Sequence, residues 1–420
     1  GITGTITNSG NIIHSRSSFI NLGLITNQNS IVNNASLTNS GTITNNSTKT
    51  ITNNNTFINN NILNNEGIVN NAHTSGIMTN NLTLNNKLTG TLNNYGTLTV
   101  QTAGTLTNIG TLNNTKTSDL INATLSIVGN LINQTNATLL NTGDMKNETN
   151  GIITNPGTID NRLLLVNNST INSTGSLLNK STGTLINKLI LNNNTSGTLD
   201  NDGTLTNSTG GVLNNYATFI NDNIIKGYGT IKIFKLATLT NNETLQVNNI
   251  FRNYGTLTNN KIITSNDSST FDNYNLLTNV STGTITTNNL FTNKKINATN
   301  SDSIDLSGIT GTINNSGSIV HNKNTYTNNG NITNLATGTI QNKNPFVVSS
   351  TGIITNNNVI TVDSILTNLG TITNNSGKTI TVNRKLVNSN ILDNEGIINI
   401  SSELGEFENT GTLNNKSAAQ

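Results

Sequence analysis

The chain contains no Cys and no Trp, only 2 Pro, and few charged or aromatic residues. Without Cys, a disulfide scaffold is excluded. Only 32% of the residues are apolar, against roughly 45–50% in globular domains, so 420 residues of this composition cannot fill two or three ordinary cores. The net charge of +2 excludes charge-driven disorder. No apolar run is long enough for a membrane-spanning helix.

The scarce charges also limit the classes of partner. The 21 Lys and Arg residues are scattered and form no basic stripe or arginine-rich arm, so we expect no nucleic-acid partner. No motif indicates a cofactor, and we expect none. The chain opens on Gly1 without a signal peptide, which is typical of a processed or excised segment of a longer product.

Asn, Thr and Gly dominate what is present, in a repeated unit Gly-Thr-Ile/Leu-x-Asn. The unit begins at Gly4, Gly41, Gly90, Gly104, Gly110, Gly203, Gly255, Gly311, Gly370 and Gly411. Neighbouring copies are often six or eight residues apart. Because a step of six residues is too short for a helix or a hairpin, the repeat predicts one short strand followed by a corner.

A longer period joins these units into turns. Three apolar ladders recur about every 20 residues: Ile313, Ile332, Ile354, Ile372, Leu392 and Leu413; Ile319, Ile340, Ile360, Ile380 and Ile400; and Tyr326, Phe346, Leu366, Leu386 and Phe407. Further up the chain, the same step joins Phe251 to Phe271 and Phe291, and Leu92 to Leu112, Ile132 and Ile152. The pattern predicts a three-sided parallel β-helix of about 21 turns, roughly 100 Å long at ~4.8 Å per turn.

Alternation along each strand predicts which residues face inward. In Gly-Thr-Ile-Thr-Asn, the Gly, Ile and Asn share one face and the Thr residues share the other. Gly and Asn tolerate the left-handed backbone that a sharp corner needs. The inward Asn residues include Asn315, Asn334, Asn356, Asn374, Asn394 and Asn415. Each amide can donate to the next turn and accept from the previous one, which satisfies polar groups that are costly to bury.

Turns of about 20 residues with three strands each, rich in Gly and Asn, resemble the parallel β-helices of filamentous haemagglutinin-type adhesins and autotransporter passengers. The resemblance implies a right-handed coil and an exported, elongated surface protein. The secretion domain that opens haemagglutinin-type exoproteins has no counterpart here, so the export route stays open. We expect residues 1–420 to form one continuous β-solenoid domain without obvious terminal caps.

The acidic residues are the candidates for catalysis or metal binding. Asp200 and Asp202 alternate along a predicted strand, and Asp222 follows one turn later. Three such groups could hold calcium or supply an acid and a base. Lys226 is the nearest cation that the sequence suggests, and a solvated outer face is the simpler interpretation.

The other candidate side chains form weaker patterns. They are Asp302 with Asp305, the trio Glu403, Glu406 and Glu408, and the histidines His14, His73 and His321. The histidines are too far apart in sequence to suggest a metal site, so we expect isolated surface residues. Thr-x-Thr pairs, such as Thr42/Thr44 and Thr371/Thr373, suggest ice binding as a further function to consider. Regular Thr columns are not predicted, because Ile391 and Asp393 stand 20 residues after Thr371 and Thr373.

We therefore expect a non-catalytic, extracellular or cell-surface structural protein. It would be a filament subunit that stacks head to tail on copies of itself, an adhesin stalk, or a virion or appendage fibre. The alternative is a glycan-binding or glycan-cleaving β-helix, with surface glycans as the partner. Tyr216, Tyr228 and Phe234 lie near Asp222 in the sequence and keep this alternative open.

Overall fold

The computed structural model describes residues 3–72, 75–116, 122–293, 311–322, 325–401 and 405–416. These residues form 59 strands and no helix, so this part of the chain contains no helix that could cross a membrane. The chain divides into two compact units, Gly1–Leu213 and Asn214–Gln420, and each is described by itself. The prediction of one continuous domain stays a prediction.

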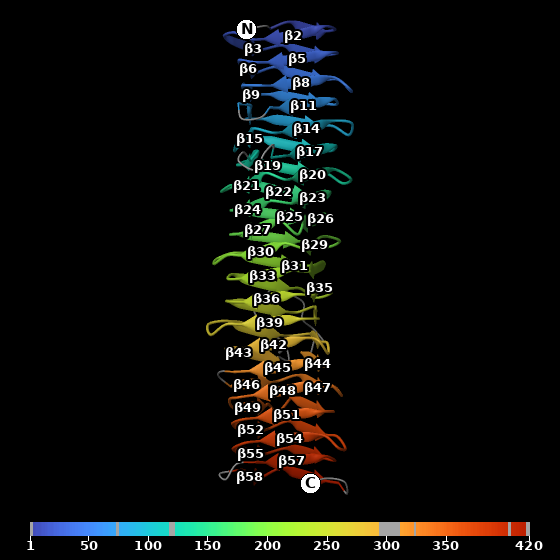
Figure 1. Ribbon diagram of the computed structural model, residues 1–420, viewed down its shortest axis with the longest axis vertical. Helices are drawn as coiled ribbons and strands as arrows, with labels where there is room; N and C mark the ends of the chain where they lie inside the picture. Colours follow the sequence, from blue (N-terminus) through green and yellow to red (C-terminus); the bar gives the residue numbers. More distant parts are fainter. Residues whose placement is uncertain are drawn as a thin grey trace. The chain divides into compact units, whose positions relative to one another are not determined.

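Within each unit, the described strands pair in parallel with the strand three positions further along the chain. In the first unit, β2 (Asn11–His14) pairs with β5 (Ser30–Asn33), and β5 pairs with β8 (Thr50–Asn53), as Figure 1 shows. The second unit follows the same rule, since β50 (Ile353–Asn356) pairs with β53 (Thr371–Asn374) and β53 with β56 (Ile391–Asn394). Three parallel sheets result, and each turn adds one strand to each sheet. The predicted all-β, three-sided parallel solenoid is confirmed.

Nearly every strand has four residues, of which the second and fourth face inward. In β7 (Thr42–Asn45), Ile43 and Asn45 are buried, whereas Thr42 and Thr44 are half-buried on the outer side. Successive side chains point to opposite faces of a strand, so one aliphatic and one Asn enter the core from each strand. This explains how a chain with so few apolar residues fills its core.

The inward Asn side chains form ladders that run in one direction. Asn334 Nδ2 donates to Asn356 Oδ1 at 2.9 Å, and Asn356 Nδ2 donates to Asn374 Oδ1 at 2.9 Å. Asn356 Nδ2 also donates to the carbonyl oxygen of Thr379 at 3.1 Å, one strand further along the next turn. Each amide therefore joins two turns and fixes a corner. The predicted Asn ladders are confirmed.

The corner glycines are required for a different reason from the one predicted. Among the described glycines, only Gly210 and Gly377 have positive φ. At Gly370, a Cβ atom would lie 2.2 Å from the carbonyl oxygen of Gly352 in the previous turn. Close approach of successive backbones therefore excludes a side chain there. The described left-handed positions are mostly not glycine; they are Ser17, Thr48, Asn136, Asn150, Ser196 and Leu236.

In the paired strands of neighbouring turns, most of the predicted ladder members lie opposite one another. They are Ile319, Ile340, Ile360 and Ile380; Tyr326, Phe346, Leu366, Leu386 and Phe407; and Asn315, Asn334, Asn356, Asn374, Asn394 and Asn415. Ile400 is one exception. Ile380 lies opposite Ile398, and Ile400 lies opposite Val382, in the place that Asn takes in other strands.

A fixed step of 20 residues fails where corners differ in length. Leu112 lies opposite Leu139, and Ile132 and Ile152 are outward residues of other strands. The longest such step joins Leu277 to Ile313. The longer corners also reduce the number of turns below the predicted 21. Strands β1–β30 make ten turns in the first unit, and β32–β59 make about nine in the second.

Candidate functional site

In the first unit, the candidate carboxylates Asp200 and Asp202 share a cation. Asp200 is the third, outward residue of β29 (Thr198–Asn201), and Asp202 follows the strand. Lys180 comes one turn earlier, directly after β26 (Ser176–Asn179), which pairs with β29. Its Nζ lies 3.6 Å from Asp200 Oδ2 and 3.1 Å from Asp202 Oδ2.

The cation that the sequence suggested was a different one. Lys226 is the third residue of β33 (Ile224–Gly227), whereas Lys180 is the residue that contacts both carboxylates. Sequence reasoning missed Lys180, although it stands 20 and 22 residues before the two carboxylates. That spacing is one turn of the solenoid and could have identified it.

These contacts form part of an ion-paired outer face. The hydrogen bond from Lys180 to Asp202 raises the pKa of the lysine, and burial opposes this effect. One turn before β26, the Arg162 guanidinium lies 2.7 Å from Asp160, and the hydrogen bond to Asp160 raises the arginine pKa. Exposed pairs of this kind contribute little stability. Because each carboxylate of this row in the first unit has a cationic partner, the arrangement is typical of a solvated face.

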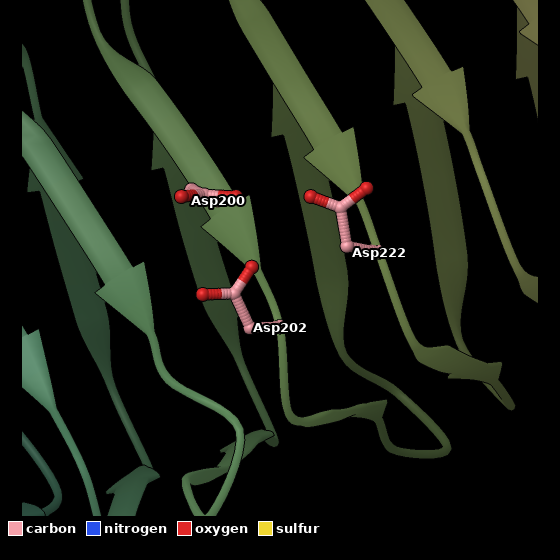
Figure 2. A group of neighbouring side chains, drawn as sticks. All are labelled: Asp200, Asp202 and Asp222. Atoms are coloured by element: carbon pink, nitrogen blue, oxygen red, sulfur yellow. The ribbon is translucent and has the colours of Figure 1, made fainter.

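Asp222 belongs to the second unit. It follows β32 (Thr218–Asn221), and its Oδ1 accepts a hydrogen bond of 2.5 Å from Asn242 Nδ2, one turn further on. Figure 2 labels Asp222 together with Asp200 and Asp202. Each aspartate is placed here only within its own unit, so a three-carboxylate metal site stays a prediction.

Both described histidines occupy ladder positions instead of the isolated surface positions that we expected. His14 is the fourth residue of β2, and its Nδ1 lies 2.7 Å from Asn33 Oδ1. His321, the fourth residue of β45 (Ser318–His321), is 1% exposed and its Nδ1 lies 2.7 Å from Thr287 Oγ1. Both imidazoles replace an inward Asn, which is a structural role. His73 lies outside the described residues.

The weaker acidic candidates show ion pairs where they are described. Lys385 Nζ lies 3.2 Å from Glu406 and 2.9 Å from Glu408, both on β58 (Glu406–Asn409). The two hydrogen bonds raise the pKa of Lys385, with Glu408 the larger cause. Asp302, Asp305 and Glu403 lie outside the described residues.

The aromatic residues near Asp222 do not share one face. Tyr216 and Phe234 follow β31 (Val212–Asn215) and β34 (Thr230–Ile233), and their rings stack with centroids 3.9 Å apart. Tyr228 follows β33, and Asp222 follows β32. Since three consecutive strands belong to three different sheets, these groups leave from three different corners of the second unit. The stacked rings cover one face of each other, which reduces the surface on which a sugar could stack.

The outward Thr residues do not build regular columns in the turns around β7. Thr42 lies between Leu24 and Ile62, and Thr44 lies between Thr26 and Asn64. The columns therefore mix Thr with aliphatic and amide side chains. This mixture does not provide the flat Thr array that ice binding would need.

No protein-family model and no curated protein matches the chain. Among solved structures, a match is "Crystal structure of TibC-catalyzed hyper-glycosylated TibA55-350 fragment". The two chains are 17% identical, the TM-score is 0.24, and the match covers 78% of this chain and 99% of that chain. With a TM-score this low, the match supports no conclusion about the fold or the function of this chain. The likeness to adhesin β-helices therefore rests on the repeat and on the parallel β-solenoid that it forms.

Proposed function

We propose that the chain is a non-catalytic structural element at the cell surface or outside the cell, either a filament subunit or an adhesin stalk. The observation that carries the proposal is an Asn ladder without a break. In the second unit it runs through Asn221, Asn241, Asn259, Asn279, Asn315, Asn334, Asn356, Asn374, Asn394 and Asn415.

A matching ladder in the first unit runs through Asn33, Asn53, Asn71, Asn94, Asn114, Asn141, Asn161, Asn179 and Asn201. Side-chain amides and backbone bonds both join each turn to the next. Stretching or bending either unit would break several of them together. A function that depends on stiffness uses this feature directly.

In the filament that we propose, the last described turn would contact a second copy of the chain. Inward residues of the last described turn are exposed, with Phe407 at 44% and Leu413 at 37%. One turn earlier, Leu386 and Leu392 are each 1% exposed. Another turn placed on this surface would bury these side chains and extend the sheets. We propose that a second copy of the chain supplies this turn.

Sedimentation velocity over a range of concentrations tests this function. We expect species larger than the monomer to grow as the concentration rises. Phe407→Lys should reduce this growth, because it places a charge at the buried centre of the contact. The matched control is Thr412→Lys, which adds the same charge at an exposed outward position of the neighbouring strand β59 (Thr412–Asn415). If the parent protein sediments as a monomer at every concentration, filament formation is wrong.

A glycan-binding or glycan-cleaving role is the second candidate, because Tyr216 is 38% exposed in the second unit. A sugar-release assay against surface polysaccharides, with Asp222→Ala and Asp200→Asn as separate variants, would reveal it. Release of sugar that either substitution abolishes would replace the structural function with an enzymatic one. We expect no release from the parent protein.

A further inference from the structure

Leu236 is a large apolar side chain that points into solvent from a corner of the second unit. It lies between β34 and β35 (Thr238–Asn241), and it is 92% exposed. The Ala237 amide donates to the carbonyl oxygen of Phe234 at 3.0 Å, which closes the turn and holds Leu236 at its tip. The apolar surface of this side chain is therefore open to a partner.

The backbone at Leu236 is strained. Its φ is +71°, in the left-handed region that Leu rarely adopts. The other described residues with positive φ are Ser, Thr, Asn or Gly, and Asn would fit this conformation with less strain. Strained residues cluster at functional sites, so the leucine indicates a role that a polar residue at this tip would not serve.

Two aromatic rings lie beside the turn. Phe234 begins the corner, and Tyr216 stacks on it with ring centroids 3.9 Å apart. Tyr216 is exposed and Phe234 is half-buried. A tyrosine combines an apolar ring with a polar hydroxyl, which suits a boundary between an apolar phase and water.

Positive charge lies next to the same turn. Lys235 belongs to the turn itself, and Lys232 is the third, outward residue of β34. No Asp or Glu occurs between positions 223 and 242. In the paired strands, Lys232 lies opposite Arg252, and Arg252 lies 3.9 Å from Asp272, which is almost fully buried. The exposed charges around the tip are therefore cationic.

The carboxylates that border this stretch of sequence lie at another corner. Asp222 follows β32, and Glu243 lies between β35 and β36 (Thr244–Val247). Both positions follow strands of one sheet, since β32 pairs with β35, whereas β34 belongs to a different sheet. Glu243 is in addition paired with Lys261.

We propose that this tip docks the second unit on an anionic lipid bilayer. Leu236 would enter the apolar edge of the bilayer, with the Tyr216 and Phe234 rings at the interface. Lys232 and Lys235 would then contact the negatively charged headgroups. Interfacial aromatic rings, an inserted apolar side chain and cations together hold proteins on anionic membranes.

A bilayer fits the tip better than other polyanions do. A nucleic acid stacks its bases on free ring faces, and Tyr216 and Phe234 cover one face of each other. An acidic sugar meets the same limit, whereas a bilayer needs no free ring face and would bury Leu236. The inference goes beyond the structural function proposed above and does not depend on it, because a stalk or filament that fails to bind lipid keeps its fold and its assembly.

Vesicle flotation of the 420-residue chain tests the proposal, because lipid-bound protein floats while filaments sediment. The probes are vesicles of phosphatidylcholine alone and of an equal mixture with phosphatidylglycerol. We expect binding to the mixed vesicles that added salt weakens. Leu236→Asn should reduce this affinity about tenfold, since it removes the inserted side chain, and should leave the protein at least as stable, since Asn suits the left-handed backbone. If the parent does not float with the mixed vesicles, the proposal is wrong.

A pair of charge variants tests the lysines. Lys232→Gln/Lys235→Gln should lower the affinity for the mixed vesicles about tenfold or more. The matched control, Lys343→Gln/Lys378→Gln, removes the same charge from other corners of the second unit and should bind as the parent does. Equal losses for the two pairs would show that net charge, and not this tip, attracts the vesicles.

The absence of Trp allows a direct measurement of insertion. The single Trp in Leu236→Trp should emit at a shorter wavelength when the mixed vesicles are added. Leu335→Trp, at an exposed corner position after β47 (Asn331–Asn334), should show no change. No shift in Leu236→Trp would overturn insertion of the tip. Binding that depends on the two lysines and not on Leu236, and that soluble dextran sulfate abolishes, would identify an acidic glycan as the partner instead of a bilayer.

Discussion

Asn356 shows how much one inward amide holds together. Its Nδ2 donates to Asn374, to the carbonyl oxygen of Asn358 and to that of Thr379, and its Oδ1 accepts from Asn334 and from the Asn358 amide. Buried polar groups left without partners cost about 1–3 kcal/mol each. The side chain therefore stabilises two corners and two ladder contacts.

We expect Asn356→Ala to lower the free energy of unfolding by about 3 kcal/mol or more, because it leaves several of these partners unsatisfied. Urea denaturation followed by circular dichroism measures the change. The matched control is the neighbouring, half-buried Asn357, whose replacement by Ala should cost less than about 1 kcal/mol. Equal losses for the two variants would contradict the ladder's importance.

We expect the buried Tyr326 to make the folded chain less stable at alkaline pH. It is fully buried in the aromatic stack between Phe291 and Phe346, and burial raises the pKa of its hydroxyl far above the usual range. The unfolded chain ionises near pH 10 while the folded chain keeps the proton. The folded state therefore holds more protons above that pH, and stability falls as pH rises, by up to about 1.4 kcal/mol per pH unit.

Tyr326→Phe removes this ionisation and keeps the ring. Denaturation curves between pH 8 and pH 11 should show a smaller loss of stability for the variant than for the parent above about pH 10. Tyr228→Phe, at a residue that is 44% exposed, is the control and should behave as the parent does. An unchanged pH dependence for Tyr326→Phe would mean that the hydroxyl is not buried in solution.

At the scale of the strand, one aliphatic side chain per strand makes the core. Ile380 is 1% exposed and lies between Ile360 and Ile398 in neighbouring turns. Ile380→Asp should destabilise the chain by more than about 3 kcal/mol, because it buries a carboxylate without a partner. Thr381→Asp alters the outward neighbour and should cost less than about 1 kcal/mol. Thermal melts of the two variants decide whether the strand faces are assigned correctly.

The corners depend on backbone contact between turns. Gly370→Ala should destabilise the solenoid by about 2 kcal/mol or more, since its Cβ would lie 2.2 Å from the Gly352 oxygen. Thr373→Ala is the control, because Thr373 is an outward, half-buried residue of the strand that follows this corner. Similar melting temperatures for both variants would show that the corners can separate without cost.

Much of the strand architecture could be predicted from the sequence, because each strand repeats one short pattern. The spacing of Ile360 and Ile380 revealed the turn, and alternation revealed the inward Asn. Corner length could not be predicted, which is why Ile398 and not Ile400 continues the ladder. Of the candidate site, the outward placement of Asp200 followed from alternation, whereas its partner Lys180 is found only when the spacing of one turn is applied to the charged residues as well.

At the scale of the whole chain, the same rule of stacking describes both units and the proposed contact between copies. The inward Asn side chains of each turn accept hydrogen bonds from the turn before and donate hydrogen bonds to the turn after. A second copy would continue this rule without new interactions, and the exposed Phe407 and Leu413 would become core residues. The proposed function therefore uses the same hydrogen bonds and apolar contacts that hold the turns of one chain together.

Negative-stain electron microscopy of the 420-residue chain over a range of concentrations tests this account most directly. The account predicts unbranched filaments that lengthen as the concentration rises. It also predicts that the Phe407→Lys variant forms shorter filaments than the parent protein. Single particles at every concentration, with the parent protein folded by circular dichroism, would contradict it.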